Sequence, residues 1–273
     1  MLRRVLAAAI LAGLAATASA QTLPPLPAAI RDAGQLRAGV RCDQPPYGFR
    51  DANGNYAGVE TEMARQIAAW AFGSADKIEL QCVTAENRIP QLNAKRVDLL
   101  LATLGITPER ARVIDFSRPY RWGASGLLVK KDSPIQKLDD VKTRSVAMLR
   151  GTTQAQWFDA NMPDLNSIKL NSASDALQAL QQGRAEAYSH DTSTLVVIAA
   201  RDPALRLVDE PYAISEAGVG IRKNEAEWKA WVDAALDRMK NEKLYDKWVN
   251  EVVPAEIRPF YLDAFNTPTP KGR

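Results

Sequence analysis

The sequence predicts an α/β protein made of two lobes, each built on a mainly parallel sheet. Short apolar strands alternate with amphipathic helices along the chain, as in strand–helix–strand units. The alternation restarts after residue 125, so the strands fall into two blocks. About 250 residues follow an N-terminal signal, which is enough for two medium-sized hydrophobic cores.

The first 20 residues have the features of a cleaved signal peptide. Arg3 and Arg4 form a short basic region, and the apolar run Val5–Ala16 is too short to span a bilayer. Ala18-Ser19-Ala20 then supplies the small residues that signal peptidase requires. We therefore expect cleavage after Ala20 and export to the periplasm. A proline-containing leader with no packing pattern follows over residues 21–33.

The first lobe is assigned to residues 34–128 and 219–260. Its first strand is expected over 36–40, and a turn at 51–55 precedes a helix. That helix carries an apolar stripe of the kind that packs on a sheet, formed by Val59, Met63, Ile67 and Trp70. The other expected elements are strands at 77–83 and 97–101, a short helix at 88–94, and C-terminal helices at 228–239 and 244–249.

The second lobe is assigned to residues 129–218. A helix is expected over 174–182, and it stops at Gly183, a typical residue after a helix end. The strands that cross between the lobes are expected near 127–131 and 214–221, and residues 261–273 are assigned to a C-terminal tail. The expected strands are 126–129, 145–149 and 185–189.

Composition excludes several classes of function. The chain has 35 basic and 32 acidic residues, and two of the arginines lie in the signal, so the mature net charge is about +1. No basic run suggests a nucleic-acid partner. His190 is the only histidine and no cluster has the spacing of metal ligands, so no metal or other cofactor is expected. No further apolar span follows the signal, so no membrane-embedded segment is expected in the mature chain.

The two cysteines, Cys42 and Cys82, leave two alternatives open. In an exported protein they can form a disulfide, which would close a loop of about 40 residues and stabilise the fold by roughly 4 kcal/mol in the chain-entropy model. The alternative is two buried free thiols.

The segment from Gly105 to Arg110 is a candidate carboxylate site. Thr107 is a suitable N-cap and Pro108 suits the first helical position. A helix that begins there presents free N–H groups beside Arg110, whose planar guanidinium can bind two carboxylate oxygens. The alternative is an ordinary capped helix with a surface arginine.

Other candidate residues stand at the ends of further strands. Gly151-Thr152-Thr153 can bind an anion through N–H and O–H donors, or can serve only as a turn. Asp191 can accept from an ammonium group, or can cap a helix. Arg41 and Arg88 also follow strands. Together, three arginines, one aspartate and several hydroxyls would suit a zwitterion that carries an additional negative charge.

In this order the segments resemble the polar amino acid-binding proteins of ABC importers, the family-3 periplasmic solute receptors, over about residues 34–250. The motifs that carry the resemblance are Pro45-Pro46-Tyr47-Gly48-Phe49, Gly58, Asp98, Thr107-Pro108-Glu109-Arg110, Asp115-Phe116-Ser117-Arg118-Pro119-Tyr120, Gly151-Thr152-Thr153, Gly183-Arg184-Ala185-Glu186-Ala187 and Tyr245-Asp246-Lys247-Trp248. The resemblance implies the type II periplasmic binding protein fold. In that fold, two α/β lobes with parallel-rich sheets are joined by two crossover strands and clamp a ligand between them.

The resemblance also implies roles for five residues. Arg110 is expected to hold the α-carboxylate of the ligand, with help from Thr153. Asp191 is expected to accept from the α-ammonium group, and Thr103 to supply a hydroxyl. Tyr47 occupies a position where an aromatic ring often flanks the ligand.

Within the family, Arg41 and Arg88 resemble the glutamate- and aspartate-binding branch, in which matching arginines hold the side-chain carboxylate. The sequence departs from that branch at Ala85, Ala173 and Gly105. Two enclosed arginines without an anion would leave buried charge unpaired, at a cost of about 3–5 kcal/mol. We therefore expect an acidic amino acid as the ligand. The alternative is a neutral or other polar amino acid such as cysteine or glutamine, whereas like-charge repulsion argues against a cationic one.

A less favoured alternative is an enzyme similar to cyclohexadienyl dehydratase. Asp191 and His190 would be the only nearby candidates for its general acid, and their surroundings suggest an ammonium site instead. No catalytic residue is therefore expected. We expect a monomeric receptor that closes around an amino acid and delivers it to the membrane permease of an ABC importer.

Overall fold

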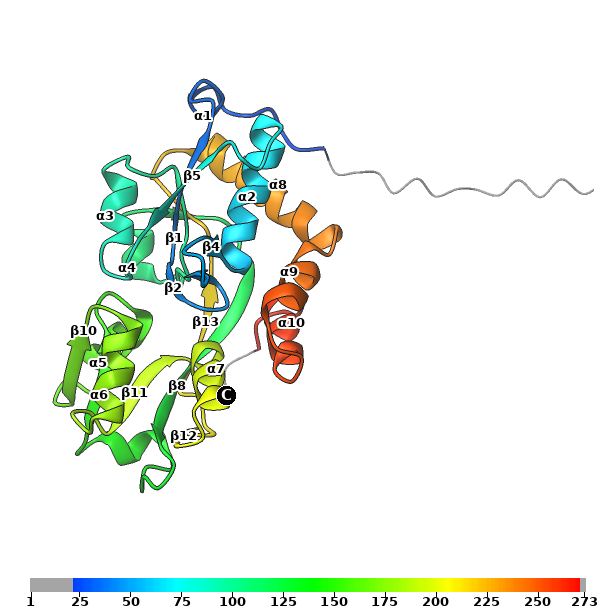
Figure 1. The fold of residues 1–273 in the computed structure, drawn as a ribbon. Coiled ribbons are helices and arrows are strands. Elements are labelled where there is room, and N and C mark those ends of the chain that lie inside the picture. The colour runs from blue at the N-terminus through cyan, green and yellow to red at the C-terminus, as the bar shows by residue number, and fades with distance from the viewer. Residues whose placement is uncertain (1–21, 271–273) are drawn as a thin grey trace, which may run out of the picture.

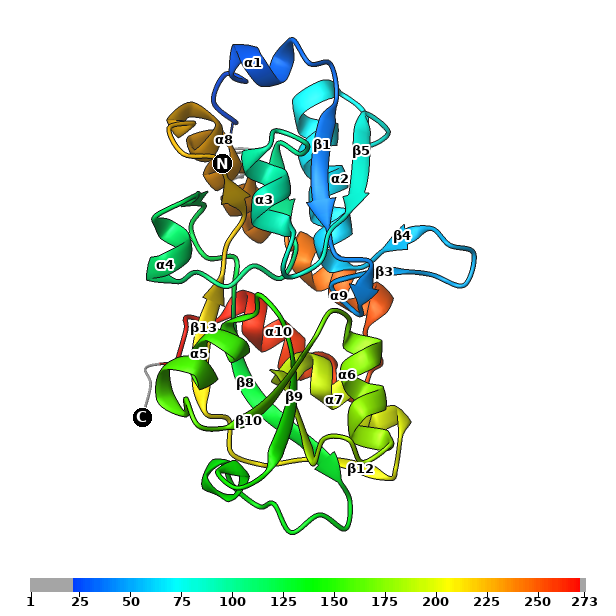
Figure 2. The same cartoon turned by 90° about the vertical axis from the view of Figure 1, so that its left-hand side faces the viewer.

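The computed structural model describes residues 22–270, which form two lobes (Figure 1). The predicted signal peptide lies outside the described residues. Strands β8 (Arg121–Lys130) and β13 (Ala213–Ala217) run between the lobes as antiparallel neighbours (Figures 1 and 2). The two-lobed α/β architecture that the sequence predicts is confirmed.

The first lobe is built on a five-stranded sheet with the order β5-β1-β6-β14-β7. Strand β1 is parallel to β5 and β6, whereas β14 is antiparallel to both of its neighbours. The strands are β1 (Leu36–Val40), β5 (Ile78–Cys82), β6 (Leu99–Leu101), β7 (Asp115–Phe116) and β14 (Gly220–Ile221). A small antiparallel sheet follows β1 and consists of β2 (Asp43–Gln44), β3 (Gly48–Arg50) and β4 (Tyr56–Ala57).

Strand alternation divides the core of this lobe into two layers. In β6, Leu99 and Leu101 face the cluster that contains α2, and Leu100 faces the cluster beneath α3. The first three members of the predicted stripe of α2 are fully buried, and Trp70 packs against the same cluster. The helices outside the second lobe are α1 (Ala28–Arg31), α2 (Val59–Phe72), α3 (Arg88–Asn93), α4 (Pro108–Ala111), α8 (Ala226–Asn241), α9 (Leu244–Val252) and α10 (Arg258–Asn266).

The second lobe has a sheet with the order β10-β9-β11-β8-β12, and β13 also pairs with β8. Strands β9, β10 and β11 are parallel, whereas β8 is antiparallel to all three of its partners. Along β8, pairing with β13 covers Arg121 to Ser125, and pairing with β11 begins at Ser125. The remaining elements are β9 (Ser145–Leu149), β10 (Asn166–Leu170), β11 (Ala187–Asp191), β12 (Leu205–Leu207), α5 (Thr153–Asn161), α6 (Ala173–Gln181), α7 (Thr192–Arg201) and the 3-10 helix Leu138–Val141.

Two predicted helix ends are confirmed. The Thr107 hydroxyl accepts a hydrogen bond from the Arg110 N–H at 3.3 Å and so caps α4. Gly183 follows the end of α6 with φ +74°, a left-handed conformation that glycine adopts without strain.

Both terminal segments contain a helix that packs on the rest of the fold. The leader, whose sequence shows no packing pattern, contains helix α1 and packs through a buried Ile30. The segment assigned to a C-terminal tail contains most of α10, in which Tyr261 and Phe265 are buried. Their rings pack against Tyr47 on the first lobe. Each segment is too short to show a clear period in the sequence, and tertiary contacts determine its structure.

Cys42 and Cys82 form a disulfide with 5.5 Å between their Cα atoms. Cys82 ends β5, and its register partner in β1 is Val40, so the cysteines lie at the same end of two neighbouring parallel strands. The structure therefore decides between the two alternatives in favour of the bond.

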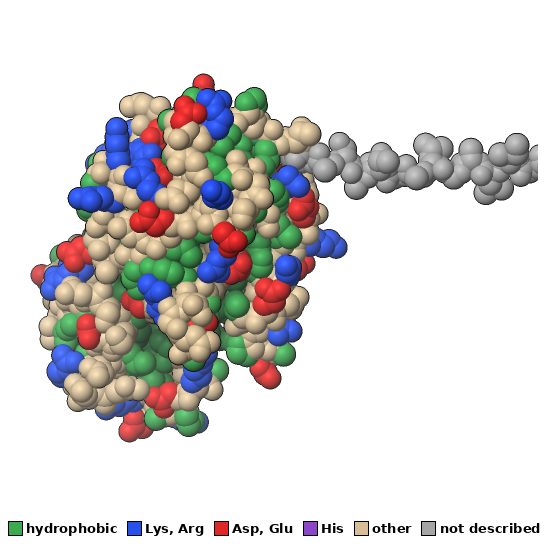
Figure 3. Space-filling model, turned by 45° about the horizontal axis from the view of Figure 1, so that its top comes forward, with side chains coloured by type: hydrophobic (Ala, Val, Ile, Leu, Met, Phe, Trp, Pro, Cys, Tyr) green, Lys and Arg blue, Asp and Glu red, His purple; other side chains and the backbone are tan. Residues whose placement is uncertain are grey.

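Acidic and basic side chains are interspersed over the face drawn in Figure 3. Within residues 22–270, none of the helices combines the length and the apolar character that crossing a membrane requires.

Candidate ligand-binding site

A small cavity lies between the lobes where strands of both sheets end. From the first lobe, residues that follow β1 and β6 line it, and from the second lobe the start of α5 and the end of β11 do so. Carboxyl ends of strands are where α/β sheets place ligand contacts. The lining residues are Arg41, Gln44, Arg88, Thr103, Thr152, Thr153, Gln154, His190 and Asp191.

Five of the seven predicted site residues line this cavity: Arg41, Arg88, Thr103, Thr153 and Asp191. Chain segments far apart in the sequence thus converge as the sequence predicts. The other two, Arg110 and Tyr47, are buried next to the cavity lining without being part of it.

Arg110 reaches from the first lobe to the second. Its Nη1 donates to the Gly105 carbonyl at 2.6 Å, and its Nη2 donates to the Gly151 carbonyl at 2.8 Å. Burial lowers the pKa of Arg110 to about 10, so the guanidinium remains charged at neutral pH. The side chain therefore presents a cation at the turn that carries Thr152 and Thr153.

The two other arginines are held differently. Arg41 forms an ion pair with Asp43, with 2.7 Å between Nη2 and Oδ1. Arg88 donates instead to carbonyl oxygens, among them that of Thr103 at 3.1 Å. Burial, with Arg110 and Arg41 nearby, lowers the pKa of Arg88 well below its ordinary value. Arg41 thus has a carboxylate partner on this chain, whereas Arg88 is bonded to neutral acceptors.

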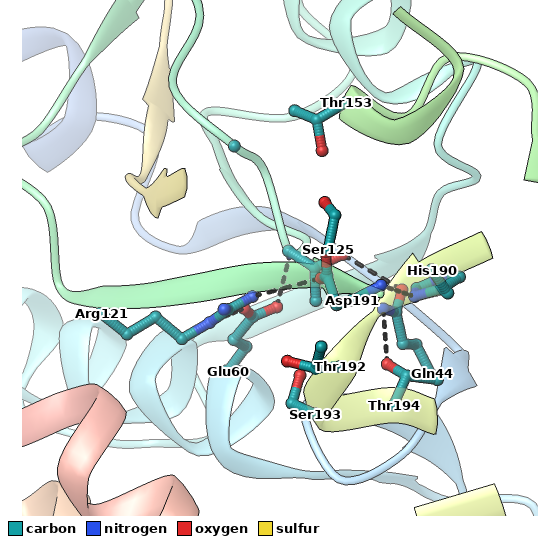
Figure 4. Close-up of polar contacts among 12 residues, drawn as sticks. Gln44, Glu60, Arg121, Ser125, Thr153, His190, Asp191, Thr192, Ser193 and Thr194 are labelled. Atoms are coloured by element: carbon teal, nitrogen blue, oxygen red, sulfur yellow. Dashed lines mark hydrogen bonds and ion pairs between the residues drawn. The ribbon is translucent and has the colours of Figure 1, made fainter. Parts of the chain in front are cut away.

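Asp191 ends β11, and its two carboxylate oxygens have different surroundings. Oδ1 accepts from the Gln154 side-chain amide at 2.8 Å. Oδ2 lies 4.0 Å from Nη2 of Arg121. Figure 4 shows Asp191 on the opposite side of the site from Thr153, with Arg121 approaching from the hinge.

Thr103 connects the cavity to a buried acid and to a second interlobe bond. Its N–H donates to Glu60 Oε2 at 2.8 Å, and its hydroxyl donates to Gln44 Oε1 at 3.1 Å. The Gln44 amide in turn donates to the Thr194 hydroxyl at 3.2 Å. Since Thr194 belongs to α7, this chain of bonds joins the two lobes.

Tyr47 lies behind the cavity. The centroid of its ring is 5.9 Å from that of Tyr261 on α10, and the Arg121 guanidinium, at the hinge, lies over the same ring at 4.2 Å from the centroid. Tyr47 therefore joins α10 to the charged groups of the hinge.

Two glycines allow the close approach of the lobes. Gly151 has φ +70°, and a Cβ there would lie 2.7 Å from the Ala85 carbonyl oxygen of the first lobe. A Cβ at Gly105 would lie 2.8 Å from Cγ2 of Thr153. Both contacts are shorter than real Cβ contacts allow, so the predicted Gly151 turn also acts as a point of contact between the lobes.

Four residues of the site were not predicted from the sequence: Gln44, Glu60, Arg121 and Gln154. Glu60 had a usable signal, because it precedes Met63, Ala64 and Ile67 by three, four and seven positions and so lies on the buried face of α2. A carboxylate on such a face requires a partner. Gln154 follows Thr153 in the same turn, whereas nothing in the local pattern singles out Gln44 or Arg121.

Comparisons with known proteins agree with this architecture. Residues 36–251 match the bacterial extracellular solute-binding proteins, family 3. The glutamine-binding protein of Geobacillus stearothermophilus is 34% identical over 196 residues, which are 71% of this chain and 75% of that protein. The ABC transporter glutamine-binding protein of Bacillus subtilis is 30% identical over 235 residues, which are 84% of this chain and 86% of that protein.

Among solved structures, the solute receptor for L-cysteine of Neisseria gonorrhoeae has a TM-score of 0.81 at 30% identity. The match covers 86% of this chain and 97% of that chain. The predicted type II periplasmic binding protein fold is therefore confirmed. None of these three proteins is named for glutamate or aspartate, and all three are named as binding proteins or receptors.

Proposed function

The chain belongs to the bacterial extracellular solute-binding proteins of family 3, and from this premise we propose that it captures a small polar amino acid in the periplasm for an ABC importer. The observation that carries the proposal is the placement of two opposite charges at one cavity, with Asp191 of the second lobe in its lining and Arg110 of the first lobe buried beside it. A free α-amino acid has a carboxylate and an ammonium group on the same carbon. One buried cation and one carboxylate acceptor therefore suit its two charges.

In this proposal Arg110 and Thr153 hold the α-carboxylate, and Asp191 accepts from the α-ammonium group. The Gly151 carbonyl, which now accepts from Arg110 and Arg88, would yield these donors to the ligand. Thr103 adds a hydroxyl, and Tyr47 supports the site from behind.

For the ligand side chain, we favour a neutral polar group such as that of glutamine or cysteine. The matched proteins quoted above are named for glutamine and L-cysteine. Arg41, one of the two arginines that suggested an acidic ligand, is already paired with Asp43. The need for a second ligand carboxylate is correspondingly reduced.

Glutamate or aspartate is a second candidate, and one observation favours it. Four arginines lie in or beside the cavity lining, Arg41, Arg88, Arg110 and Arg121, and three carboxylates oppose them among the described residues there, Asp43, Glu60 and Asp191. A zwitterion leaves this excess of one positive charge, whereas an acidic amino acid removes it.

We also propose how capture is transmitted. The lobes close around the ligand by bending within Arg121–Ser125 of β8 and within β13. The first stretch lies just before the range 127–131 expected from the sequence, and β13 overlaps the expected range 214–221. The permease binds the closed form more tightly than the open form, and this difference in affinity drives transfer of the ligand.

Binding without turnover is the proposed outcome. Asp191 accepts a hydrogen bond from Gln154 and lies near the cation of Arg121. These are the surroundings of an acceptor for an ammonium group rather than of a general acid. Incubation with prephenate or arogenate is expected to leave both compounds unchanged by chromatography, and turnover of either would support the dehydratase alternative.

The test is calorimetric titration of mature protein that has been unfolded and refolded to remove bound ligand. We expect L-glutamine or L-cysteine to bind with micromolar or tighter affinity, and L-arginine not to bind. Arg110→Met should weaken binding at least roughly 100-fold, because the α-carboxylate loses its charged donor. Arg112→Met, an exposed arginine two residues away, is the matched control and should bind as the wild type does.

Two results would change the conclusion. Tight binding of glutamate or aspartate alone would establish the second candidate. No binding of any amino acid in the panel would refute the proposed function.

A further inference from the structure

A buried cation lies where β8 leaves the first lobe. Arg121 is the first residue of β8, and its side chain is only 3% exposed. Its guanidinium lies 4.2 Å over the Tyr47 ring, and its Nε has no hydrogen-bond partner within the described part of the chain. A buried charge is costly unless nearby anions offset it, so the groups around Arg121 indicate its role.

Two carboxylates from different lobes flank this guanidinium. Glu60 Oε1, on α2 of the first lobe, lies 3.8 Å from Nε of Arg121. Asp191 Oδ2, on β11 of the second lobe, lies 4.0 Å from Nη2. Figure 4 shows the Arg121 guanidinium next to Glu60 and pointing toward Asp191. Arg121 is therefore the charged connection between a buried acid of one lobe and the proposed ammonium acceptor of the other.

Glu60 is a fixed anchor for this connection. Its Oε1 accepts from the Tyr120 hydroxyl at 2.6 Å, and its Oε2 accepts from the Thr103 N–H at 2.8 Å. Arg121 offsets the charge of Glu60, so the pair adds no net charge that would repel a ligand ammonium group. Without Arg121, the Glu60 carboxylate would be an uncompensated anion near Asp191.

The geometry of β8 directs Arg121 toward Asp191. Residues 121, 123 and 125 share one face of the strand. Ser125 is the register partner of Asp191, and the Gln154 amide donates at 2.8 Å both to the Ser125 hydroxyl and to Asp191 Oδ1. Gly123 lies midway between Arg121 and Ser125 in the strand. A Cβ at this position would lie 3.1 Å from Nη1 of Arg121, so the glycine leaves room for the guanidinium.

We propose that Arg121, anchored by Glu60, is a positioning residue that holds the Asp191 carboxylate in the orientation that accepts the ligand's α-ammonium group. Gln154 fixes one oxygen of Asp191 by a hydrogen bond. Arg121 attracts the other from 4.0 Å, without a hydrogen bond that would occupy it. The second oxygen therefore remains available to the ligand. This inference rests on the proposed function of the same site.

The test compares each amino acid with its deaminated counterpart. The pairs are L-glutamine and glutaramate, L-cysteine and 3-mercaptopropionate, and L-glutamate and glutarate. The measured quantity is the ratio of the two dissociation constants for the pair that the wild-type protein binds tightest. This ratio reports recognition of the ammonium group, whereas a general loss of packing weakens both compounds equally.

The main variant is Glu60→Gln/Arg121→Met, which removes both charges together so that Glu60 is not left as a buried carboxylate without its cation. We expect it to lower the ratio roughly 10-fold, because a misplaced Asp191 forms a poorer charged hydrogen bond. Arg121→Lys keeps the cation and should retain the ratio within about threefold. Asp191→Asn, which removes the proposed ammonium acceptor, gives the ratio expected when the ammonium group is no longer recognised.

The control is Arg118→Met, at an arginine three positions earlier whose exposed side chain pairs with Asp237 on α8. It should leave the ratio unchanged. Thermal melting verifies that each variant is folded, and Arg121→Gln replaces the double variant if the latter is not. If the variant without Arg121 loses the same affinity for both compounds, or none, the ratio is unchanged and the inference is overturned. A wild-type protein that binds none of the amino acids would instead refute the proposed function, and the inference with it.

Discussion

His190 is a buried imidazole between the two lobes whose protonation is defined by its neighbours. Its Nδ1 accepts the N–H of Asp191 at 2.7 Å, so in the neutral ring the proton is on Nε2. Burial lowers the pKa of His190 below its ordinary value of 6.5, and Asp191 only partly opposes this shift. The folded protein therefore favours the neutral ring more strongly than the unfolded chain does.

This difference predicts a dependence of stability on pH. Between the lowered folded pKa and 6.5, the unfolded chain binds more protons, so the free energy of unfolding rises with pH. The contribution of His190 to the free energy of unfolding is complete above about pH 6.5. Below that pH the contribution decreases by at most about 1.4 kcal/mol per pH unit. His190→Asn, which keeps an acceptor, should show a smaller loss in urea titrations between pH 7.5 and 5.5. Parallel pH profiles for the variant and the wild type would contradict the assignment.

At the scale of single residues, the functional residues at strand ends could be predicted from the sequence, but the groups with which they form ion pairs could not. Arg41, Arg88 and Asp191 could be found because each follows an apolar strand, and such ends converge in α/β sheets. Pairing of Arg41 with Asp43 was not expected, because an acid two positions away can equally face solvent. Arg121 has no local signal at all, since its role depends on Glu60 and Asp191, which lie 60 or more residues away.

At the scale of elements, regular strands and long helices were predictable from their periods. The helix over Val59–Phe72 and the strand over Ser145–Leu149 follow directly from apolar spacing. Strands of two residues such as Asp115–Phe116, and the helix α7, which is largely apolar on several sides, lack such a period. Tertiary contacts form them, so the sequence alone does not locate them.

Gly151, in the turn before α5, allows a direct test of whether close contact between the lobes is needed for ligand binding. Gly151→Ala places a methyl group against the Ala85 backbone of the first lobe, and should weaken binding at least roughly 10-fold by holding the lobes apart. It should also cost about 1 kcal/mol of stability, because φ is +70°.

Gly183→Ala is the matched control for this prediction. Gly183 has φ +74°, but the nearest atom to its added Cβ is Nζ of Lys130 at 3.8 Å, within the second lobe. It should lose similar stability in thermal melting and bind with unchanged affinity in calorimetry. Equal affinities for the two variants would show that contact at Gly151 does not limit closure.

At the scale of the whole molecule, α10 links both lobes and the hinge. The Tyr261 hydroxyl donates to the Ser193 carbonyl on α7 of the second lobe, while the Tyr261 ring packs on Tyr47 of the first. Trp122 of β8 donates to Thr267, just after the helix, at 3.1 Å. Figure 1 shows α10 beside the strands that cross between the lobes. The helix lies outside residues 36–251, which match the family, so it adds a connection to the shared fold.

Removing one hydroxyl should loosen this connection. Tyr261→Phe leaves the buried Ser193 carbonyl without that donor and should lower the free energy of unfolding by about 1–3 kcal/mol. Ligand-free protein should then have a larger radius of gyration by small-angle X-ray scattering, because the lobes separate more readily. Tyr245→Phe is the control, since its hydroxyl bonds to Leu236 within the first lobe. An increase of the same size in the control would exclude a specific role for α10.

The disulfide has a consequence for where the protein can work. Cys42 directly follows Arg41, and Cys82 lies six positions before Arg88, so the bond fixes the two chain segments that carry these arginines. A chain whose two cysteines are reduced, as thiols are in a reducing compartment such as the cytosol, lacks this link. The arginines are then free to shift relative to each other. The protein is therefore expected to bind amino acids weakly while its two cysteines are reduced, and to become an effective receptor only once they are oxidised.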